Sequence, residues 1–222
     1  MAAAPDNVES AVKQLAHDIP ALDEYLLARY LNDIVSWNAR IPLVSRISTI
    51  PVLMRLVRQS ALLHDFVREI AGPNLPRGKV NVVDVGTGAG FPGVIWKMVD
   101  QSAHVTLIER NQKKATFLQR VASTLGFSGL DIIERDAREI SLQPAMNHAF
   151  DVALMFAVGR PADVYVYVER LLCPGGWYAT VRPRNESKTP AEMGERVKFV
   201  AAREEPFGSL CVYRKIGSRE PS

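Results

Sequence analysis

The stretch VVDVGTGAGFPG, residues 82–93, places glycines at positions 86, 88 and 90 directly behind an apolar run that contains the acid Asp84. Because glycine has no Cβ atom, alternating glycines let the backbone approach a ligand closely. The β-branched run before the loop predicts a strand, and the apolar stretch after it predicts a helix. In doubly wound sheets, ligands bind at the carboxyl ends of the strands, so we interpret this loop as the floor of a ligand site.

Short β-branched runs and helical stretches alternate after this loop, which is typical of an α/β fold with a parallel, doubly wound sheet. Residues 196–216 indicate two strands joined by a turn at 206–208, which predicts an antiparallel end to the sheet. Counting the strand before the loop as the first, the alternating segments of the sequence are 80–85, 92–99, 104–110, 113–126, 130–136, 150–156 and 162–172.

The first part of the chain has a different pattern, with apolar residues at helical spacing over 21–38 and again over 52–67. Prolines and glycines interrupt both patterns between residues 71 and 79. We therefore predict an N-terminal helical cap over residues 1–72 and a core domain over residues 73–222. At 222 residues and 47% apolar composition, the chain is long enough to bury a substantial core.

Acidic residues follow three successive predicted strands, and their charge indicates the kind of ligand. Asp84 would repel a pyrophosphate but attract the α-ammonium of S-adenosylmethionine. Glu109 ends the next strand, where it can accept hydrogen bonds from both ribose hydroxyls, as in NAD sites. Asp136 follows the third strand and can accept from an adenine amino group. The glycines alone would also suit nucleotide phosphates or a plain tight turn. Together with the acids, they predict a site for S-adenosylmethionine formed by these residues and their neighbours: Asp84, Gly86, Thr87, Gly88, Gly90, Phe91, Glu109, Arg110, Asp136 and Ala137.

Charge and cysteine content restrict the partners. The formal net charge is only +3, but the segment from Arg40 to Lys79 holds seven basic residues against two acids. This predicts a local basic face that could hold phosphate, formed by Arg40, Arg46, Arg55 and Arg58. The two cysteines form no CxxC motif, and histidines do not occur at metal-ligand spacing, so we expect no metal. No signal pattern and no apolar run of membrane-spanning length occurs, so we expect a cytoplasmic protein without a membrane partner.

Three stretches resemble the GidB/RsmG family of bacterial methyltransferases: VVDVGTGAGFPGVIWKMV, TLIERNQKKATFLQRVASTLG and the N-terminal WNARIPLVS. The resemblance implies a Rossmann-like class I S-adenosylmethionine-dependent methyltransferase that modifies guanine-N7 of small-subunit ribosomal RNA. It also implies that Gly86, Gly88, Gly90 and Glu109 surround the cofactor. Lys113 or Lys114, with Phe117 and Leu118, would contribute from the following helix.

The chain departs from the family pattern at positions expected to face the substrate, which are Pro42, Val44, Gln59, Leu62, Met155, Phe156, Arg182 and Pro183. From these positions we predict that Met155, Phe156 and Arg182 contact the substrate together with Arg40, Arg46 and Arg58. Guanine-N7 loses no proton when it is methylated, so the absence of a recognisable general base is consistent with this acceptor. Three functions remain open: an RNA methyltransferase, a relative acting on a small heterocycle in an apolar pocket closed by Met155, Phe156 and Tyr165, and a protein that only binds the cofactor.

Overall fold

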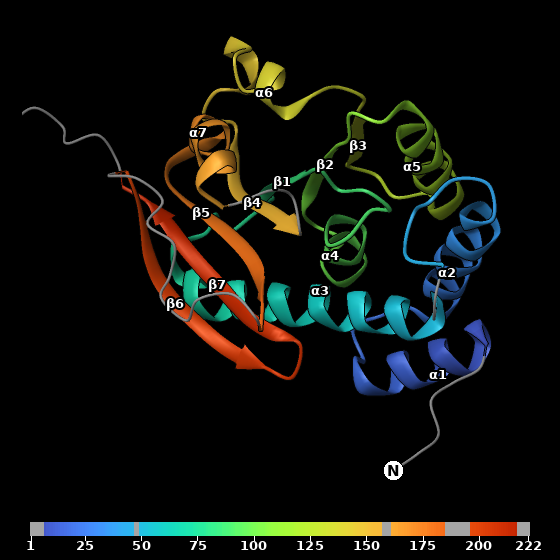
Figure 1. The fold of residues 1–222 in the computed structure, drawn as a ribbon. Coiled ribbons are helices and arrows are strands. Elements are labelled where there is room, and N and C mark those ends of the chain that lie inside the picture. Colours follow the sequence, from blue (N-terminus) through green and yellow to red (C-terminus); the bar gives the residue numbers. More distant parts are fainter. Residues whose placement is uncertain (1–6, 47–48, 157–160, 185–195, 217–222) are drawn as a thin grey trace, which may run out of the picture.

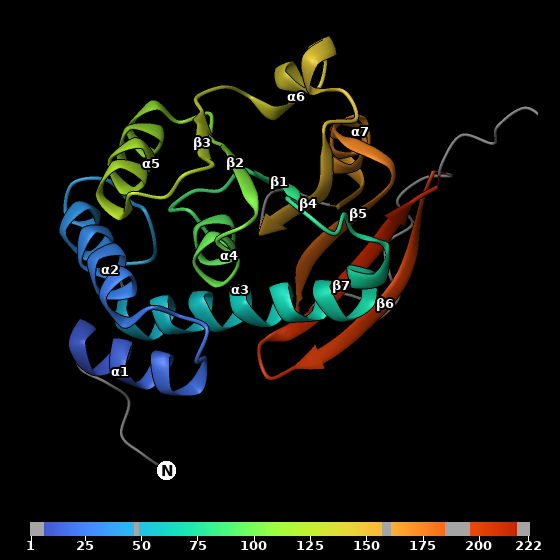
Figure 2. The ribbon, with the colours of Figure 1, turned by 180° about the vertical axis from the view of Figure 1, so that it is seen from behind.

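The computed structural model describes residues 7–46, 49–156, 161–184 and 196–216, and its central feature is a seven-stranded sheet with helices on both faces (Figures 1 and 2). The strands are β1 (Asn81–Val85), β2 (His104–Ile108), β3 (Leu130–Ile133), β4 (Phe150–Phe156), β5 (Leu172–Pro183), β6 (Val197–Glu205) and β7 (Gly208–Lys215). The helices are α1 (Val8–Asp18), α2 (Glu24–Asn38), α3 (Thr49–Ala71), α4 (Gly93–Val99), α5 (Gln112–Leu125), α6 (Ala137–Ile140) and α7 (Pro161–Leu171), with short 3₁₀ turns at Gly72–Asn74 and Pro144–Met146.

The strand order β3-β2-β1-β4-β5-β7-β6 gives the sheet a switch point between β1 and β4. The first five strands are parallel, whereas β7 runs antiparallel to both β5 and β6. This arrangement is a Rossmann-like fold and confirms the predicted mostly parallel sheet with an antiparallel end. In open sheets of this kind, ligands bind at the carboxyl ends of the strands beside the switch point.

The core has two parts because neighbouring residues of a strand face opposite sides of the sheet. Val82, Val152 and Leu154 belong to the hydrophobic cluster that also contains buried residues of the first five helices. Val83 and Ala153 face the other side, where α7 and Ile140 of α6 cover the sheet. Because both faces are buried, the central strands are almost continuously apolar, which is typical of parallel sheets.

The three N-terminal helices belong to the first of these two core parts. Figures 1 and 2 show α3 crossing beneath the sheet, with α1 on the side of α3 that faces away from the strands. Helix α3 packs against α4, β5 and β7, and one hydrophobic cluster runs from Ala11 in α1 to Val212 in β7. The core is therefore continuous across residue 72, and the division into a cap and a core domain stays a prediction.

Local capping interactions fix where several helices begin and end. The side chains of Asp23 and Asn111 accept hydrogen bonds from the amides of Leu26 and Lys114, which caps the N-termini of α2 and α5. Gly126 ends α5 in the left-handed conformation, at φ 65°. The sequence interpretation had identified neither α1 nor β5.

Candidate active site

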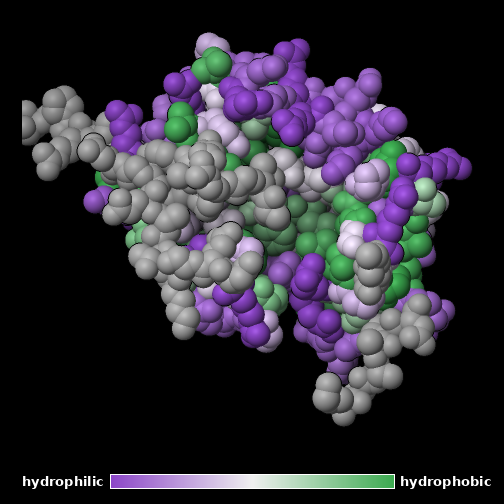
Figure 3. Space-filling model, viewed as in Figure 1, coloured by the Kyte–Doolittle hydropathy of each residue, from purple (hydrophilic) through white to green (hydrophobic). Residues whose placement is uncertain are grey.

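A cavity of about 620 Å³ opens at the carboxyl ends of β1, β2, β3 and β4. Its volume lies in the range of small-molecule and cofactor sites. On the face shown in Figure 3, hydrophilic residues gather over α6 and α5 above a recess with apolar walls. The cavity is lined by residues at four strand ends and by residues of the helices α5, α6 and α7: Val85, Gly86, Gly88, Ile108, Glu109, Arg110, Lys114, Arg135, Asp136, Ala137, Arg138, Phe156, Val164 and Tyr167.

The glycine loop divides into a part that lines the cavity and a part that packs against helices. A Cβ atom on Gly88 would meet nothing closer than 4.0 Å, so the space beside this residue is open. A Cβ atom on Gly90 would lie 2.6 Å from Val94 and 2.8 Å from the hydroxyl of Tyr30. Packing against Val94 and Tyr30 therefore requires glycine at position 90. Gly86 and Gly88 line the cavity, whereas Gly90 does not.

Thr87 and Phe91 belong to the loop and were predicted as cofactor contacts. Both are buried, and neither lines the cavity. Phe91 packs against Tyr30, with 5.4 Å between the ring centroids. Thr87 donates a hydrogen bond of 2.6 Å from its hydroxyl to Asp84 Oδ2. Both residues therefore stabilise the loop from the protein side.

Asp84 also lies beneath the loop, and this placement corrects its predicted contact with a ligand ammonium. The side chain is fully buried and absent from the cavity lining. Besides the Thr87 hydroxyl, Oδ2 accepts a hydrogen bond from the amide of Gly93 at 2.8 Å, which ties the strand end to the start of α4. Burial raises the pKa of Asp84 to about 7, although the hydrogen bonds from Thr87 and Gly93 act in the opposite direction. The negative charge of Asp84, on which the prediction rested, could not show that its side chain is inaccessible to a ligand.

Glu109 faces the cavity from the end of β2, as expected. Oε2 accepts a hydrogen bond from the Gly88 amide at 3.0 Å, and Oε1 accepts one from the Asn111 amide at 2.8 Å. The carboxylate thus joins the glycine loop to the start of α5. An ionised carboxylate has about four acceptor positions, so two remain for a ligand.

Asp136 lines the cavity at the start of α6, where its carboxylate forms a two-point ion pair with Arg138. The guanidinium donates to Oδ1 at 2.9 Å and to Oδ2 at 2.7 Å, and the Arg138 amide also donates to Oδ1 at 2.9 Å. These contacts lower the pKa of Asp136 to about 2, mainly through the Arg138 side chain. Arg110, which also lines the cavity, approaches Oδ2 to 3.9 Å. One acceptor position therefore remains on Oδ2.

Phe156, Val164 and Tyr167 form the apolar wall of the cavity where β4 meets α7. Met155, which was predicted beside Phe156, lies in the core on the other face of the sheet, because adjacent strand residues point in opposite directions. Arg182 is also buried away from the cavity, and its Nε atom donates to Cys211 Sγ at 3.0 Å. The Tyr165 side chain falls outside the described part of the structure.

The arginines predicted to form a basic face are not assembled at the cavity. Arg46 donates to the carbonyls of Asn38 and Ala39 and so caps the end of α2, while Arg58 forms a 2.6 Å ion pair with Asp18. Arg40 and Arg55 are exposed. None of the four lines the cavity. Basic residues gather instead at the cavity mouth, where Arg135 and Arg138 join Arg110 and Lys114. The sequence carried a signal for this cluster, since Arg110 directly follows Glu109 and Arg135 directly precedes Asp136.

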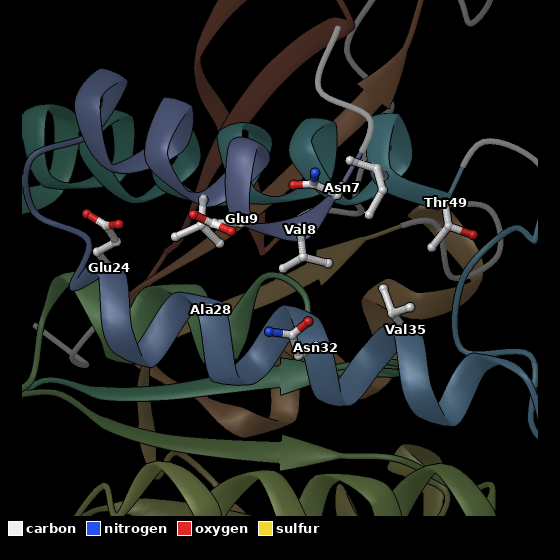
Figure 4. A pocket seen from close by; sticks show the side chains of 10 residues that line it. Asn7, Val8, Glu9, Glu24, Ala28, Asn32, Val35 and Thr49 are labelled. Atoms are coloured by element: carbon white, nitrogen blue, oxygen red, sulfur yellow. The ribbon is translucent and has the colours of Figure 1, made fainter.

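A groove of about 720 Å³ lies among the N-terminal helices, away from the glycine loop. Figure 4 shows Glu24 toward one end and Thr49 toward the other, with Val8 and Val35 between them. Its lining contains none of the residues discussed above and belongs mainly to α1 and α2. In the described part of the chain, no three His, Cys, Asp or Glu side chains are arranged to hold a metal ion, and no helix is long and apolar enough to cross a membrane.

A family model described as GidB, rRNA small subunit methyltransferase G, matches residues 23–208. The chain belongs to the GidB family. A relative from Nostoc punctiforme, named ribosomal RNA small subunit methyltransferase G, is 38% identical over 103 residues, which cover 46% of this chain and 42% of the relative. A relative of the same name from Dictyoglomus thermophilum is 28% identical over 178 residues, which cover 80% of this chain and 71% of the relative. The aligned stretch therefore spans less than half the length of the Nostoc protein.

Solved structures share the fold of this GidB-family chain. A proposed methylase from Haemophilus influenzae superposes with a TM-score of 0.55 at 16% identity, covering 69% of this chain and 88% of that chain. The [4+2]-cyclase SpnF gives a TM-score of 0.52 at 17% identity, with 72% and 82% covered. Because one fold serves different reactions, these similarities show the architecture alone.

Proposed function

We propose that this GidB-family chain transfers a methyl group from S-adenosylmethionine to guanine-N7 of small-subunit ribosomal RNA. The observation that carries the proposal is the arrangement at the switch point, where the Glu109 carboxylate and the open backbone of Gly88 share one cavity wall. The family match and the names of the relatives point to the same substrate class.

The cavity residues fit S-adenosylmethionine, which supplies an electrophilic methyl group when bound. Glu109 keeps two acceptor positions for the ribose hydroxyls, and Asp136 keeps one on Oδ2 for the adenine amino group. Gly86 and Gly88 leave the adjoining space free of side chains. Asp84, Thr87, Gly90 and Phe91 act indirectly, by holding this backbone in place.

A ring nitrogen such as guanine-N7 presents a lone pair and releases no proton on attack, so the protein need only position it and exclude water. Phe156, Val164 and Tyr167 provide an apolar wall suited to the flat face of a base. The same wall would suit a small heterocyclic substrate, which is the second candidate. The charge at the mouth favours RNA, because a polyanion can contact several cations at once.

The decisive experiment measures methyl transfer to small ribosomal subunits isolated from a bacterial strain that lacks its GidB-family gene. With labelled S-adenosylmethionine, we expect label in the RNA and 7-methylguanosine after digestion. A parallel panel of small heterocycles should stay unlabelled. Label in a heterocycle but not in the subunits would establish the second candidate and overturn RNA as the substrate.

Salt dependence tests where the RNA is held. Arg135 is exposed at the cavity mouth and has no ion pair among the described residues, whereas Arg58 is paired with Asp18 on α1. Arg135→Ala should flatten the slope of log affinity against log salt by about 0.7 to 0.9, which is the effect of one lost phosphate contact. Arg58→Ala, the matched control, should leave the slope unchanged. A flatter slope in Arg58→Ala alone would place the RNA along α3, as the sequence had suggested.

A further inference from the structure

Tyr30 connects the N-terminal helices to the glycine loop. It lies in α2, its side chain is fully buried, and its hydroxyl donates a 2.8 Å hydrogen bond to the carbonyl of Ala89. Ala89 lies between Gly88 and Gly90 and is itself buried. Among the residues that the structure describes, no other donor reaches this carbonyl. The bond spans 59 positions in the sequence, so nothing local to the loop provides it.

The contact is more than one hydrogen bond, because Tyr30 packs against three consecutive loop residues. Its ring is tilted against Phe91 at 5.4 Å between centroids, and its hydroxyl occupies the space that a Cβ atom on Gly90 would need. Burial, with the nearby Asp84 carboxylate, raises the pKa of Tyr30 well above its ordinary value. The hydroxyl therefore stays protonated and remains a donor at physiological pH.

Two hydrogen bonds thus hold neighbouring loop residues from opposite directions. Glu109 accepts from the Gly88 amide on the cavity side, and Tyr30 donates to the Ala89 carbonyl on the helical side. Gly88 and Gly90 both have positive φ, at 62° and 106°, so the loop between them has a backbone that depends on external contacts to stay in one conformation. A loop released on one side would sample other conformations before it could bind a ligand.

Contacts with α5 hold helix α2 in place relative to the cavity. Trp37 packs against Phe117 of α5 at 5.6 Å between ring centroids, and Asp33 pairs with Arg120 of α5 at 3.5 Å. The same helix α5 carries Lys114 at the cavity mouth. A shift of α2 would therefore move the loop and α5 together.

We propose that Tyr30 is a positioning residue for the cofactor: through Ala89 it fixes the glycine loop in the conformation that binds S-adenosylmethionine. This inference rests on the proposed function of the cavity. It gives the N-terminal helices a role in cofactor affinity, in addition to covering the sheet.

The test replaces one hydroxyl in the full-length protein. Tyr30→Phe keeps the ring packing but leaves the Ala89 carbonyl without its donor, and calorimetry should show S-adenosylhomocysteine binding about three- to tenfold more weakly. In the methylation assay, KM for S-adenosylmethionine should rise by a similar factor while kcat at saturating cofactor stays unchanged. Tyr178→Phe is the matched control, because Tyr178 is equally buried but lies on the other face of the sheet.

The outcomes separate this inference from the proposed function. If the wild-type protein does not bind S-adenosylhomocysteine, the proposed cofactor is wrong and the inference falls with it. If the wild type binds and Tyr30→Phe binds equally well, only the inference is overturned. Equal weakening by Tyr178→Phe would mean that a general loss of stability, rather than loop positioning, lowers the affinity, and would also overturn it.

Discussion

The buried carboxyl group of Asp84 makes the stability of the folded protein depend on pH. Its pKa is raised to about 7 by burial, whereas an aspartate in the unfolded chain titrates near 3.8. Between these two values the folded protein holds a proton that the unfolded chain has released. Stability contributed by this group is therefore fully present below about pH 4 and decreases as pH rises toward 7.

Asp84→Asn should remove this dependence, since an amide can still accept from Thr87 and Gly93 but does not titrate. Relative to the wild type, we expect the free energy of unfolding of Asp84→Asn to rise with pH between about 4 and 7, by at most about 1.4 kcal/mol per pH unit. Urea denaturation at several pH values measures it. A constant difference between the two proteins would show that Asp84 is ionised throughout this range.

Glu109 is the residue on which cofactor recognition depends most directly in the proposed function. Glu109→Ala should weaken S-adenosylhomocysteine binding by about 1.5 to 3 kcal/mol, the range for hydrogen bonds to a charged group. Glu139→Ala is the control, because Glu139 is exposed on α6 and does not line the cavity. Calorimetry on both variants checks the prediction, and undiminished affinity in Glu109→Ala would exclude the ribose assignment.

At the scale of the loop element, two glycines of identical appearance in the sequence should respond differently to alanine. Gly90→Ala forces a Cβ atom against Val94 and Tyr30, so it should lower the free energy of unfolding by several kcal/mol. Gly88→Ala meets no atom within contact distance and should cost only about 1 to 2 kcal/mol, from its positive φ. Its methyl group points into open space beside the cavity, so cofactor binding should suffer more than stability.

Thermal unfolding and calorimetry on these two variants distinguish the effects. A loss of stability in Gly88→Ala as large as in Gly90→Ala would mean that the whole loop is a structural turn.

The sequence pattern predicted the loop and its flanking strand and helix, since these depend on local periodicity. It could not separate Gly88 from Gly90, because Tyr30 reaches the loop from a helix about 60 residues earlier.

The same reasoning applies to other elements. Strand alternation was sufficient to show that Met155 and Phe156 face opposite sides, although the prediction placed both at the substrate. Glu109 lines the cavity because a strand end fixes its position relative to the loop. Asp84 does not, because its depth beneath the loop is set by the start of α4, through the Gly93 amide.

At the scale of the whole molecule, the helices before residue 72 share one hydrophobic cluster with the strands. Long helix α3 buries apolar side chains against α4, β5 and β7, in the same cluster as Val82 and Leu154. A change of periodicity along the chain marks where the architecture changes. It does not show whether the two parts share a core, because shared packing depends on contacts between distant segments.

Truncation tests this directly. Each large apolar side chain is worth about 1.5 to 3 kcal/mol when fully buried, and a typical domain is stable by only about 5 to 15 kcal/mol in total. Helix α3 alone buries several such side chains, namely Leu53, Met54, Val57, Leu63, Phe66 and Val67. We therefore expect a fragment of residues 73–222 to lack a cooperative thermal transition and dispersed amide resonances, and to regain both when it is co-expressed with residues 7–72.

A shorter truncation provides the control, because α1 packs on α2 and α3 without contributing to the cover of the strands (Figure 2). A chain that starts at residue 20 loses α1 and the Asp18–Arg58 ion pair but keeps α2 and α3. It should unfold cooperatively at a lower temperature than the full chain and still bind S-adenosylhomocysteine, since Tyr30 remains in place. If the 73–222 fragment instead unfolds cooperatively and binds S-adenosylhomocysteine with full-length affinity, the two parts are independent domains and Tyr30 has no role in holding the loop.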